Sequence, residues 1–259
     1  MLDFLNNTFA NLDYSVIKSM EGIMKSAGGF FTPICKAVTF LGEYGILYLL
    51  IALVLLLFSK TRKIGVCIIG GIAFSAIFTS FIIKPLVARP RPFLDPRYRP
   101  IWLLYIGGKP ETGYSFPSGH VTSITATVLA YFFFGSKKWG AISFSAVILM
   151  AFARVYLLAH YASDVLFGII VGTLAFCCSA GVTVLIFKLL NKFSNIELCA
   201  FILDFNVFDF LKKSIDESVP PVDYSDEAII REQQELLQDE EIKFEKEEDS
   251  GIVGINTEE

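Results

Sequence analysis

Both histidines of the chain stand in short motifs that could transfer a phosphoryl group. His160 precedes Asp164 by four residues, and His120 ends the run Ser-Phe-Pro-Ser-Gly-His. If a helix begins by His160, this spacing places the carboxylate and the imidazole on one helix face, where Asp164 can reach one ring nitrogen. The other nitrogen is then the better nucleophile. A single histidine at a helix end is more often structural, but here both fall in one group of polar residues.

Basic residues near these motifs could bind a phosphoryl group during its transfer. Lys84 and Arg91 are seven residues apart in a proline-rich run, and Arg154 interrupts the apolar run 148–158. The transition state of phosphoryl transfer spreads negative charge over three oxygens, which cations stabilise. Structural alternatives stay open, because Lys84 could snorkel at a helix end and Arg154 could pair with Asp164.

Backbone amides before His120 could add donors that bind an anion. Pro117 suits the first turn of a helix, and the amides of Ser118 and Gly119 would then lie at a helix N-terminus. His120 would be the acid that protonates the leaving oxygen. The expected site thus has a catalytic part and a phosphate-binding part. The catalytic residues are His160, His120 and Asp164, and the phosphate-binding residues are Lys84, Arg91, Ser118, Gly119 and Arg154.

Membrane-spanning helices are the elements expected to position these residues. The chain has 259 residues, of which 54% are hydrophobic, and a mean hydropathy of +0.57, outside the usual range of a soluble domain. The apolar blocks are near the roughly 20 residues that cross a bilayer, at about 38–58, 64–83, 119–134, 139–158 and 165–190. The sequence predicts an all-α, integral-membrane bundle of about five spans with its polar motifs at one membrane depth. The third block is short and rich in Ser and Thr, which favours packing against other helices over contact with lipid.

The segments outside the bundle are expected to have other roles. Residues 1–36 form an N-terminal region whose helical spacing of apolar residues is typical of an interfacial helix. The membrane catalytic bundle is expected at 37–190, an amphipathic connector at 191–213, and an acidic tail at 214–259. Residues 1–213 carry 19 Lys and Arg against 10 Asp and Glu, whereas the tail carries 3 against 16. We expect a disordered or partly helical tail, and the alternative is that it binds a protein partner.

The basic residues of the short loops predict the orientation in the membrane. Lys60 and Lys63 follow the first apolar block, Lys137 and Lys138 the third, and Lys192 the fifth. An excess of basic residues marks the cytoplasmic side. The raw count does not decide here, because the opposite side is also rich in Lys and Arg, but these loops have the excess once the basic residues assigned to phosphate are discounted. We therefore expect a multi-pass protein of the cell membrane, with the site on the extracytoplasmic face and the tail in the cytoplasm. The acidic pI reflects the tail, so nothing indicates a nucleic-acid partner.

Together these motifs resemble those of the type-2 phosphatidic acid phosphatase superfamily. The family pattern K-x6-RP, PSGH and SR-x5-H-x3-D is similar to Lys84-x6-Arg91-Pro92, Pro117-Ser-Gly-His120 and Ala153-Arg154-x5-His160-x3-Asp164. The resemblance covers about residues 37–190. It implies a phosphohistidine at His160 oriented by Asp164, protonation of the leaving group by His120, and neither metal nor other cofactor. Ala153 stands where the family usually has Ser, so one supporting hydroxyl is missing.

These expectations lead to one main hypothesis and three alternatives. The main hypothesis is a membrane lipid phosphatase that acts on undecaprenyl diphosphate, phosphatidic acid or phosphatidylglycerophosphate, and the compact body favours the first. A catalytically silent membrane protein that binds phosphorylated lipid or acts as a scaffold is the first alternative, and the paired histidines argue against it. A vanadate-dependent haloperoxidase would share the oxyanion pocket, but those enzymes are soluble. A transporter is disfavoured because the sequence places no charge at the middle of a span.

Overall fold

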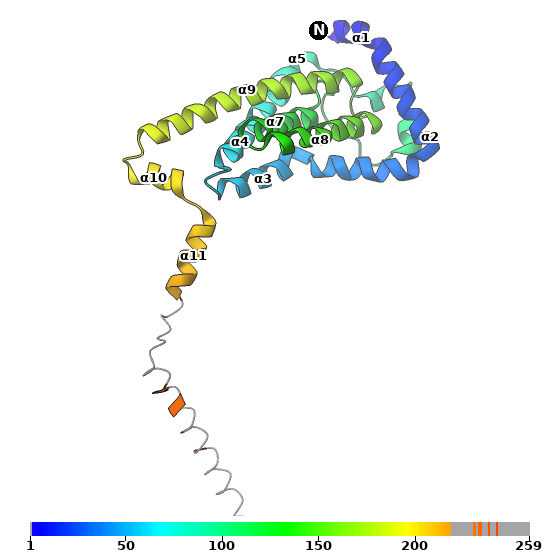
Figure 1. The fold of residues 1–259 in the computed structure, drawn as a ribbon. Helices are drawn as coiled ribbons and strands as arrows, with labels where there is room; N and C mark the ends of the chain where they lie inside the picture. Colours follow the sequence, from blue (N-terminus) through cyan, green and yellow to red (C-terminus); the bar gives the residue numbers. More distant parts are fainter. Residues whose placement is uncertain (1, 219–229, 232, 235–237, 239–241, 243–259) are drawn as a thin grey trace, which may run out of the picture. The chain divides into compact units, whose positions relative to one another are not determined.

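A computed structural model describes residues 2–218, 230, 231, 233, 234, 238 and 242. These residues form helices and no strand (Figure 1), which confirms the predicted all-α class. The chain divides into two units, Met1–Phe210 and Leu211–Glu259. All residues of the expected site lie in the first unit. Most of the acidic tail, for which we predicted disorder or partial helix, lies outside the described residues.

The α-helices range from single turns to long apolar rods. In chain order they are α1 (Leu2–Thr8), α2 (Ala10–Leu41), α3 (Ile46–Leu56), α4 (Arg62–Ala76), α5 (Lys84–Val87), α6 (Arg99–Tyr105), α7 (Gly119–Phe134), α8 (Lys137–Tyr156), α9 (Ala162–Lys192), α10 (Glu197–Asp204) and α11 (Val207–Ser218). Three shorter segments connect some of them: the 3-10 turns η1 (Glu43–Gly45) and η3 (Pro92–Leu94), and the π-helical stretch η2 (Ile77–Ile83).

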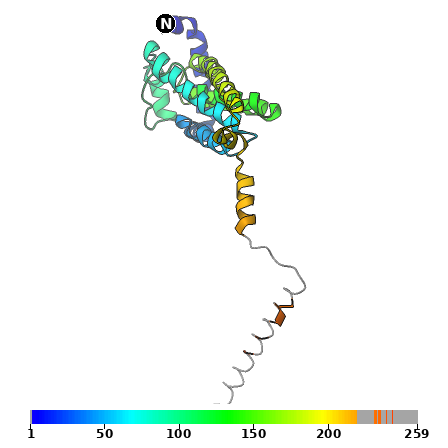
Figure 2. The same cartoon turned by 90° about the vertical axis from the view of Figure 1, so that its left-hand side faces the viewer.

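Helices α4, α7 and α9 pack against one another at the centre of the bundle. Helix α8 packs against α7 and α2, and α3 packs against α4. In Figure 1, α7 and α8 are drawn between α9 and the pair α2 and α3. After a quarter turn (Figure 2), α9 in yellow-green still lies beside α4 in cyan, so these two helices are neighbours in both views. Helices α4, α7 and α9 share an apolar cluster that includes Ile68, Val121, Ala126 and Phe176.

Two glycines of α9 let α7 approach closely. A Cβ added at Gly168 would lie 3.0 Å from the Ser118 carbonyl oxygen, and one added at Gly172 would lie 2.6 Å from the Thr122 carbonyl oxygen. Small residues at such crossings allow tight packing of helices in membranes. Because Thr122 and Thr125 are also buried, the prediction that the third apolar block packs against other helices is confirmed. This contact places the start of α7 against the start of α9.

The described helices include three that are long and apolar enough to cross a membrane. They are Arg62–Leu94, Lys137–Tyr156 and Ala162–Lys192, and the pair Ala10–Leu41 and Ile46–Leu56, bent by 49°, would be a fourth. Helix α7 is apolar but has 16 residues, or about 24 Å at roughly 1.5 Å per residue, against a hydrocarbon core of about 30 Å. A helical membrane bundle is therefore present, while the count of five spans stays a prediction.

The N-terminal region differs from the prediction in its helix boundaries. Helix α2 is broken by a non-helical backbone at Ala27 (φ −142°, ψ 25°), and beyond this kink a second segment continues to Leu41, past the expected end of the region at residue 36. Figure 1 shows the bend of this helix around one end of the bundle. The first expected span is also interrupted, because η1 separates α2 from α3 and Gly45 has φ +71°. The interfacial position of the region stays a prediction.

Candidate active site

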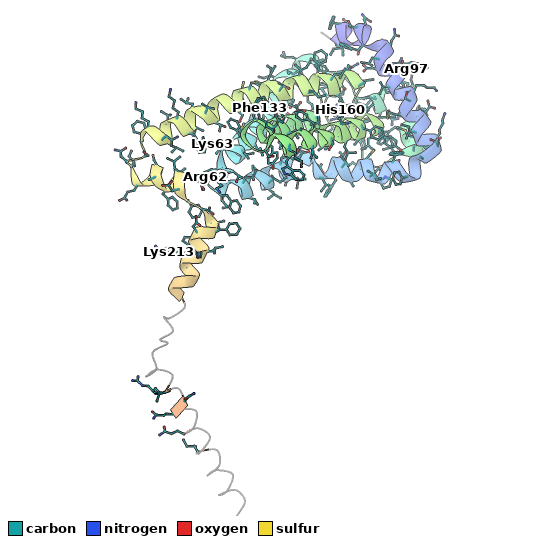
Figure 3. All side chains as sticks on the ribbon, in the orientation of Figure 1. Arg62, Lys63, Arg97, Phe133, His160 and Lys213 are labelled. Atoms are coloured by element: carbon teal, nitrogen blue, oxygen red, sulfur yellow. The ribbon has the colours of Figure 1, made fainter. Side chains whose placement is uncertain are left out.

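The predicted site residues lie in separate elements that converge toward one end of the bundle. Figure 3 shows Arg62 and Lys63 at one end and Arg97 at the other, with His160 inside the bundle on the side of Arg97. The contributing elements are the start of α5 (Lys84), the loop after α5 (Arg91), the start of α7 (Ser118, Gly119, His120), the last turn of α8 (Arg154), the connection between α8 and α9 (His160) and the first turn of α9 (Asp164).

The imidazole of His160 lies between a carboxylate and a guanidinium group. Its Nδ1 is 3.6 Å from Asp164 Oδ2, and its Nε2 is 3.5 Å from Arg91 Nη1. The first distance is a close contact, slightly beyond a hydrogen bond. The residue is 1% exposed. Nδ1 therefore faces the group that could hold its proton, while Nε2 faces the cations.

His160 precedes helix α9 and is not part of it. The sequence predicted a shared helix face, but α9 begins at Ala162. The contact forms because the Asp164 side chain folds back over the helix start, where its Oδ2 accepts a hydrogen bond from the Tyr161 amide at 2.9 Å. The His160 amide donates to the Arg154 carbonyl oxygen at 3.3 Å, which fixes the connection from the other side.

Asp164 is held by donors that the spacing argument did not identify. Arg89 Nη1 donates to Oδ1 at 2.6 Å, and Ser115 Oγ donates to Oδ2 at 2.7 Å. Asp164 is 0% exposed, so these bonds satisfy a carboxylate that would otherwise be costly to bury. The carboxylate is thus fixed in direction toward His160.

Arg154 pairs with Glu111, and the alternative that it pairs with Asp164 is wrong. Arg154 Nη2 lies 2.6 Å from Glu111 Oε2, and Arg91 Nη1 lies 2.8 Å from the same oxygen. Asp164 instead pairs with Arg89. Arg154 is fully buried, yet its Nε and Nη1 have no hydrogen-bond partner among the described residues. Buried donors without partners are rare, so these two are candidates to bind an anion.

Arg91 also fixes the loop that carries Glu111. Its Nε donates to the Gly113 carbonyl oxygen at 3.1 Å and its Nη2 to the Thr112 carbonyl oxygen at 3.2 Å. Positive φ angles at Gly107, Gly108 and Gly113 flank Glu111 on both sides, and glycine adopts this backbone region without strain. Arg91 therefore holds the loop directly after Glu111, while Gly107 and Gly108 allow the chain to bend before it.

The start of α7 contributes in a different way from the prediction. Helix α7 begins at Gly119, with Ser118 as N-cap and Pro117 before it. The Ser118 amide donates to the Asp164 carbonyl oxygen at 3.0 Å, so this amide is already engaged. The Ser118 hydroxyl and His120 Nε2 are buried and unpaired within the described part of the chain. The hydroxyl is therefore a better candidate donor to an anion than the amide.

Electrostatic interactions connect the remaining predicted residues with this centre. Lys84 interacts with Arg91, Glu111, Arg154 and Asp164, and His120 interacts with Arg154, Glu111, Lys84 and Arg91. Both residues therefore lie within the field of the two arginines. The described residues contain no group of three or more His, Cys, Asp and Glu side chains that could hold a metal ion.

Burial and charge determine the protonation of the two groups nearest the arginines. Burial, followed by the positive charges of Arg154 and Arg91, lowers the pKa of His160 well below its ordinary value of 6.5. Burial raises the pKa of Glu111, but the hydrogen bond and charge of Arg154 and the charge of Arg91 lower it to about 2. At neutral pH the site therefore presents a neutral imidazole and an ionised Glu111.

Sequence comparison identifies the family of this chain. The model of the PAP2 superfamily matches residues 64–190. The decaprenylphosphoryl-5-phosphoribose phosphatase of Mycobacterium tuberculosis is 31% identical over 137 residues, which are 53% of this chain and 72% of that protein. The chain belongs to the PAP2 superfamily. The PAP2 region contains all of the predicted site residues, from Lys84 to Asp164.

Other PAP2 relatives are similar over a comparable length. The undecaprenyl-diphosphatase of Sulfolobus acidocaldarius is 28% identical over 169 residues, which are 64% of this chain and 71% of that protein. The crystal structure of a PAP2 type phosphatidylglycerolphosphate phosphatase from Bacillus subtilis has a TM-score of 0.48 and 20% identity, covering 69% of this chain and 96% of that one. The relatives compared by sequence are named as phosphatases, and the long apolar helices make this chain a multi-pass membrane protein.

The sequence analysis assigned no role to Glu111, Arg89 or Ser115, which contact the predicted site residues. Glu111 had a detectable signal, since it and Asp95 are the only acids between Glu43 and Asp164. Arg89 lies within the Lys84-to-Pro92 motif but was not assigned a role, and Ser115 opens the run that ends at His120. Ala153, the departure from the family pattern, is 0% exposed and lies in an apolar cluster with Tyr156 and Leu158.

Proposed function

We propose that this PAP2 protein is a lipid phosphatase that works through a phosphohistidine at His160. The observation that carries the proposal is the orientation of the imidazole, with Nδ1 toward Asp164 and Nε2 3.5 Å from Arg91 Nη1. A neutral imidazole oriented in this way has its lone pair on the side where cations would bind a phosphoryl group. Asp164 would stabilise the positive charge that forms on the ring.

The proposed reaction has two steps. In the first, His160 Nε2 attacks phosphorus, the bond to the lipid oxygen breaks, and His120 gives its proton to that oxygen. In the second, His120 takes a proton from water, the water oxygen attacks the phosphohistidine, and inorganic phosphate leaves as His160 is restored. Arg91, Arg154 and Lys84 would stabilise the charge on the three equatorial oxygens in both transition states.

Glu111 must leave Arg91 and Arg154 for this reaction to occur. Its carboxylate binds the same guanidinium nitrogens that we assign to the phosphoryl oxygens. The side chain is 37% exposed, whereas those of Arg91 and Arg154 are 4% and 0% exposed. Glu111 is therefore the partner that can move into solvent, and an incoming phosphate would replace its charge.

Among lipid substrates we propose a polyprenyl phosphate or diphosphate such as undecaprenyl diphosphate. Two relatives support this class, because one is named undecaprenyl-diphosphatase and the other decaprenylphosphoryl-5-phosphoribose phosphatase. Phosphatidic acid and phosphatidylglycerophosphate are the competing substrates. We further propose that the site opens on the extracytoplasmic face and the tail lies in the cytoplasm, on the basis of the loop lysines at 137, 138 and 192. The test is a single cysteine engineered beside Lys137. If a reagent added outside intact cells labels it, the orientation is the opposite of the one proposed.

The deciding experiment measures phosphate release by the purified protein from these three lipids, with and without EDTA. We expect turnover that persists in chelator and is lost in His160→Asn, and a labelled phosphoenzyme that is stable in alkali and labile in acid. Arg97→Gln is the matched control, since Arg97 is a 70% exposed arginine that pairs with Asp95 at the surface. Loss of turnover in EDTA contradicts the metal-independent mechanism. Lipid binding without any turnover would favour the silent scaffold.

A further inference from the structure

A buried acid in the N-terminal helix faces the proposed site. Asp13 is 4% exposed, although it lies in α2, outside the residues matched by the family model. It interrupts a buried stripe at helical spacing that contains Leu5, Ile17 and Met24, which are each 2% exposed or less. A carboxylate on such a face is costly unless its oxygens accept hydrogen bonds.

Asp13 accepts hydrogen bonds from the first turn of α9 and from Arg89. Its Oδ1 accepts from the Ser163 amide at 2.8 Å, and its Oδ2 accepts from the Ser163 hydroxyl at 2.8 Å. The same Oδ2 accepts from Arg89 Nη2 at 2.8 Å. Ser163 directly precedes Asp164, so Asp13 holds the turn of α9 from which Asp164 reaches His160.

Arg89 connects Asp13 with Asp164. Nη2 binds Asp13, while Nη1 donates to Asp164 Oδ1 at 2.6 Å and to the Ser163 hydroxyl at 2.8 Å. The guanidinium carbon lies 4.0 Å from the centre of the Tyr161 ring, within the range of a cation–π contact. Arg89 is 3% exposed. Its direction is thus fixed by two carboxylates and an aromatic ring.

This arrangement decides which oxygen of Asp164 is available to the imidazole. Arg89 occupies Oδ1, so that Oδ2 is the oxygen near His160 Nδ1. Without Asp13, Arg89 would keep one carboxylate partner, and both its Nη2 and the Ser163 amide would lose an acceptor. The guanidinium and the turn of α9 could then shift together, and Asp164 with them.

We propose that Asp13 and Arg89 are positioning residues that orient His160 through Asp164. The N-terminal helix thereby completes the active site from outside the family-matched region. The proposal rests on the proposed role of His160 as nucleophile. Residues that orient a metal-bound histidine from outside its ligand shell change activity by about 10–100-fold, and we expect a similar magnitude for this histidine. Asp13→Asn should therefore lower kcat by about 10–100-fold and leave KM within about 2–3-fold, because Asp13 touches none of the phosphate ligands.

Nuclear magnetic resonance tests the orientation independently of turnover. The chain has two histidines, so in a His120→Gln background a ¹⁵N-imidazole spectrum reports His160 alone. We expect the proton on Nδ1 in that background, and a mixture of tautomers after Asp13→Asn. Glu21→Gln is the matched control in the same helix, since Glu21 pairs with the exposed Lys18 and Lys25 and with no residue of the site. An unchanged tautomer in Asp13→Asn overturns the proposal.

A double-mutant cycle tests whether Asp13 acts through Arg89. If it does, Asp13→Asn adds little to the loss of kcat caused by Arg89→Lys, whereas independent effects that multiply contradict the connection. If Arg89→Lys fails to fold, the tautomer in Asp13→Asn decides. Absence of phosphate release by the wild-type chain would refute the proposed function, and a tautomer that still depends on Asp13 would uphold the positioning role.

Discussion

Glu111→Gln should tighten phosphate binding, because it removes the charge that competes for Arg91 and Arg154. Glu111 Oε2 lies 2.8 Å from Arg91 Nη1 and 2.6 Å from Arg154 Nη2. A hydrogen bond to a charged group contributes about 1.5–3 kcal/mol when buried, but exposed pairs contribute only about 0–1 kcal/mol. The side chain of Glu111 is 37% exposed, so about 1.5–2 kcal/mol for the two bonds together is a reasonable magnitude.

The expected change in affinity follows from that energy. Since about 1.4 kcal/mol corresponds to a tenfold change, Glu111→Gln should lower KM for the lipid and the inhibition constant of inorganic phosphate by about 10–30-fold. The two constants should change by the same factor, because both reflect displacement of one carboxylate. Without added phosphate the variant should also have a lower Tm, since Arg154 loses its acid partner, and added phosphate should restore it.

The assay is steady-state hydrolysis of a lipid phosphate at several concentrations of inorganic phosphate, combined with thermal unfolding. Asp95→Asn is the matched control, because Asp95 is the other acid of the same region and pairs with exposed Arg97. An unchanged KM in Glu111→Gln would mean that the carboxylate does not compete with substrate. Weaker binding of phosphate would show that Glu111 belongs to the binding site itself, and the displacement argument would be refuted.

Three further predictions follow from other parts of the structure. In the pH profile of kcat/KM, the acid limb should have its midpoint below pH 6.5, because burial and the charges of Arg154 and Arg91 lower the pKa of His160 and keep the imidazole unprotonated. A midpoint above pH 6.5 with both a phosphomonoester and a diphosphate would contradict this. Gly172→Ala should destabilise the protein by about 1–3 kcal/mol through overpacking, since the new Cβ would lie 2.6 Å from the Thr122 carbonyl oxygen. Gly181→Ala is the control: its Cβ would meet nothing within 4 Å, so Tm should be nearly unchanged. Deletion of residues 219–259 should leave kcat/KM within about twofold, because all groups of the proposed site, from Asp13 to Asp164, lie in the first unit; loss of turnover would assign the tail a role in activity.

The elements that position the site could be predicted where apolar blocks are continuous. The block at 119–134 matches α7 in both bounds, and α8 and α9 begin two or three residues before the predicted starts at 139 and 165. The break between α2 and α3 could not be predicted from hydropathy, because it depends on the backbone at Gly45. The continuation of α2 beyond its kink at Ala27 was missed for the same reason, because the kink depends on the backbone and not on hydropathy.

The pairing of charges in the site was harder to predict than its residue types. Short motifs bring His160 near Asp164 because the residues are close in sequence. Arg154 was given Asp164 as an alternative partner for the same reason, but the connection between α8 and α9 directs Asp164 toward Arg89. Asp13 is 150 residues from Ser163, to which it is hydrogen bonded. Contacts over that separation depend on how α2 packs, although an acid within a buried stripe was a signal in the sequence.

The exposure of the acids divides the arginines into two functional kinds. Arg89 binds Asp13 and Asp164, whose side chains are 6% and 0% exposed, so separating either pair would leave a buried charge unpaired, which costs several kcal/mol. Arg91 and Arg154 share Glu111, which water reaches, and two donors of Arg154 have no acceptor among the described residues. The first arginine is therefore suited to fix the proposed nucleophile, and the other two to exchange one anion for another. Arg89 contacts Asp164, which lies beside His160 Nδ1, whereas Arg91 lies beside Nε2. The orientation of the imidazole can therefore persist while Arg91 and Arg154 exchange Glu111 for a phosphate.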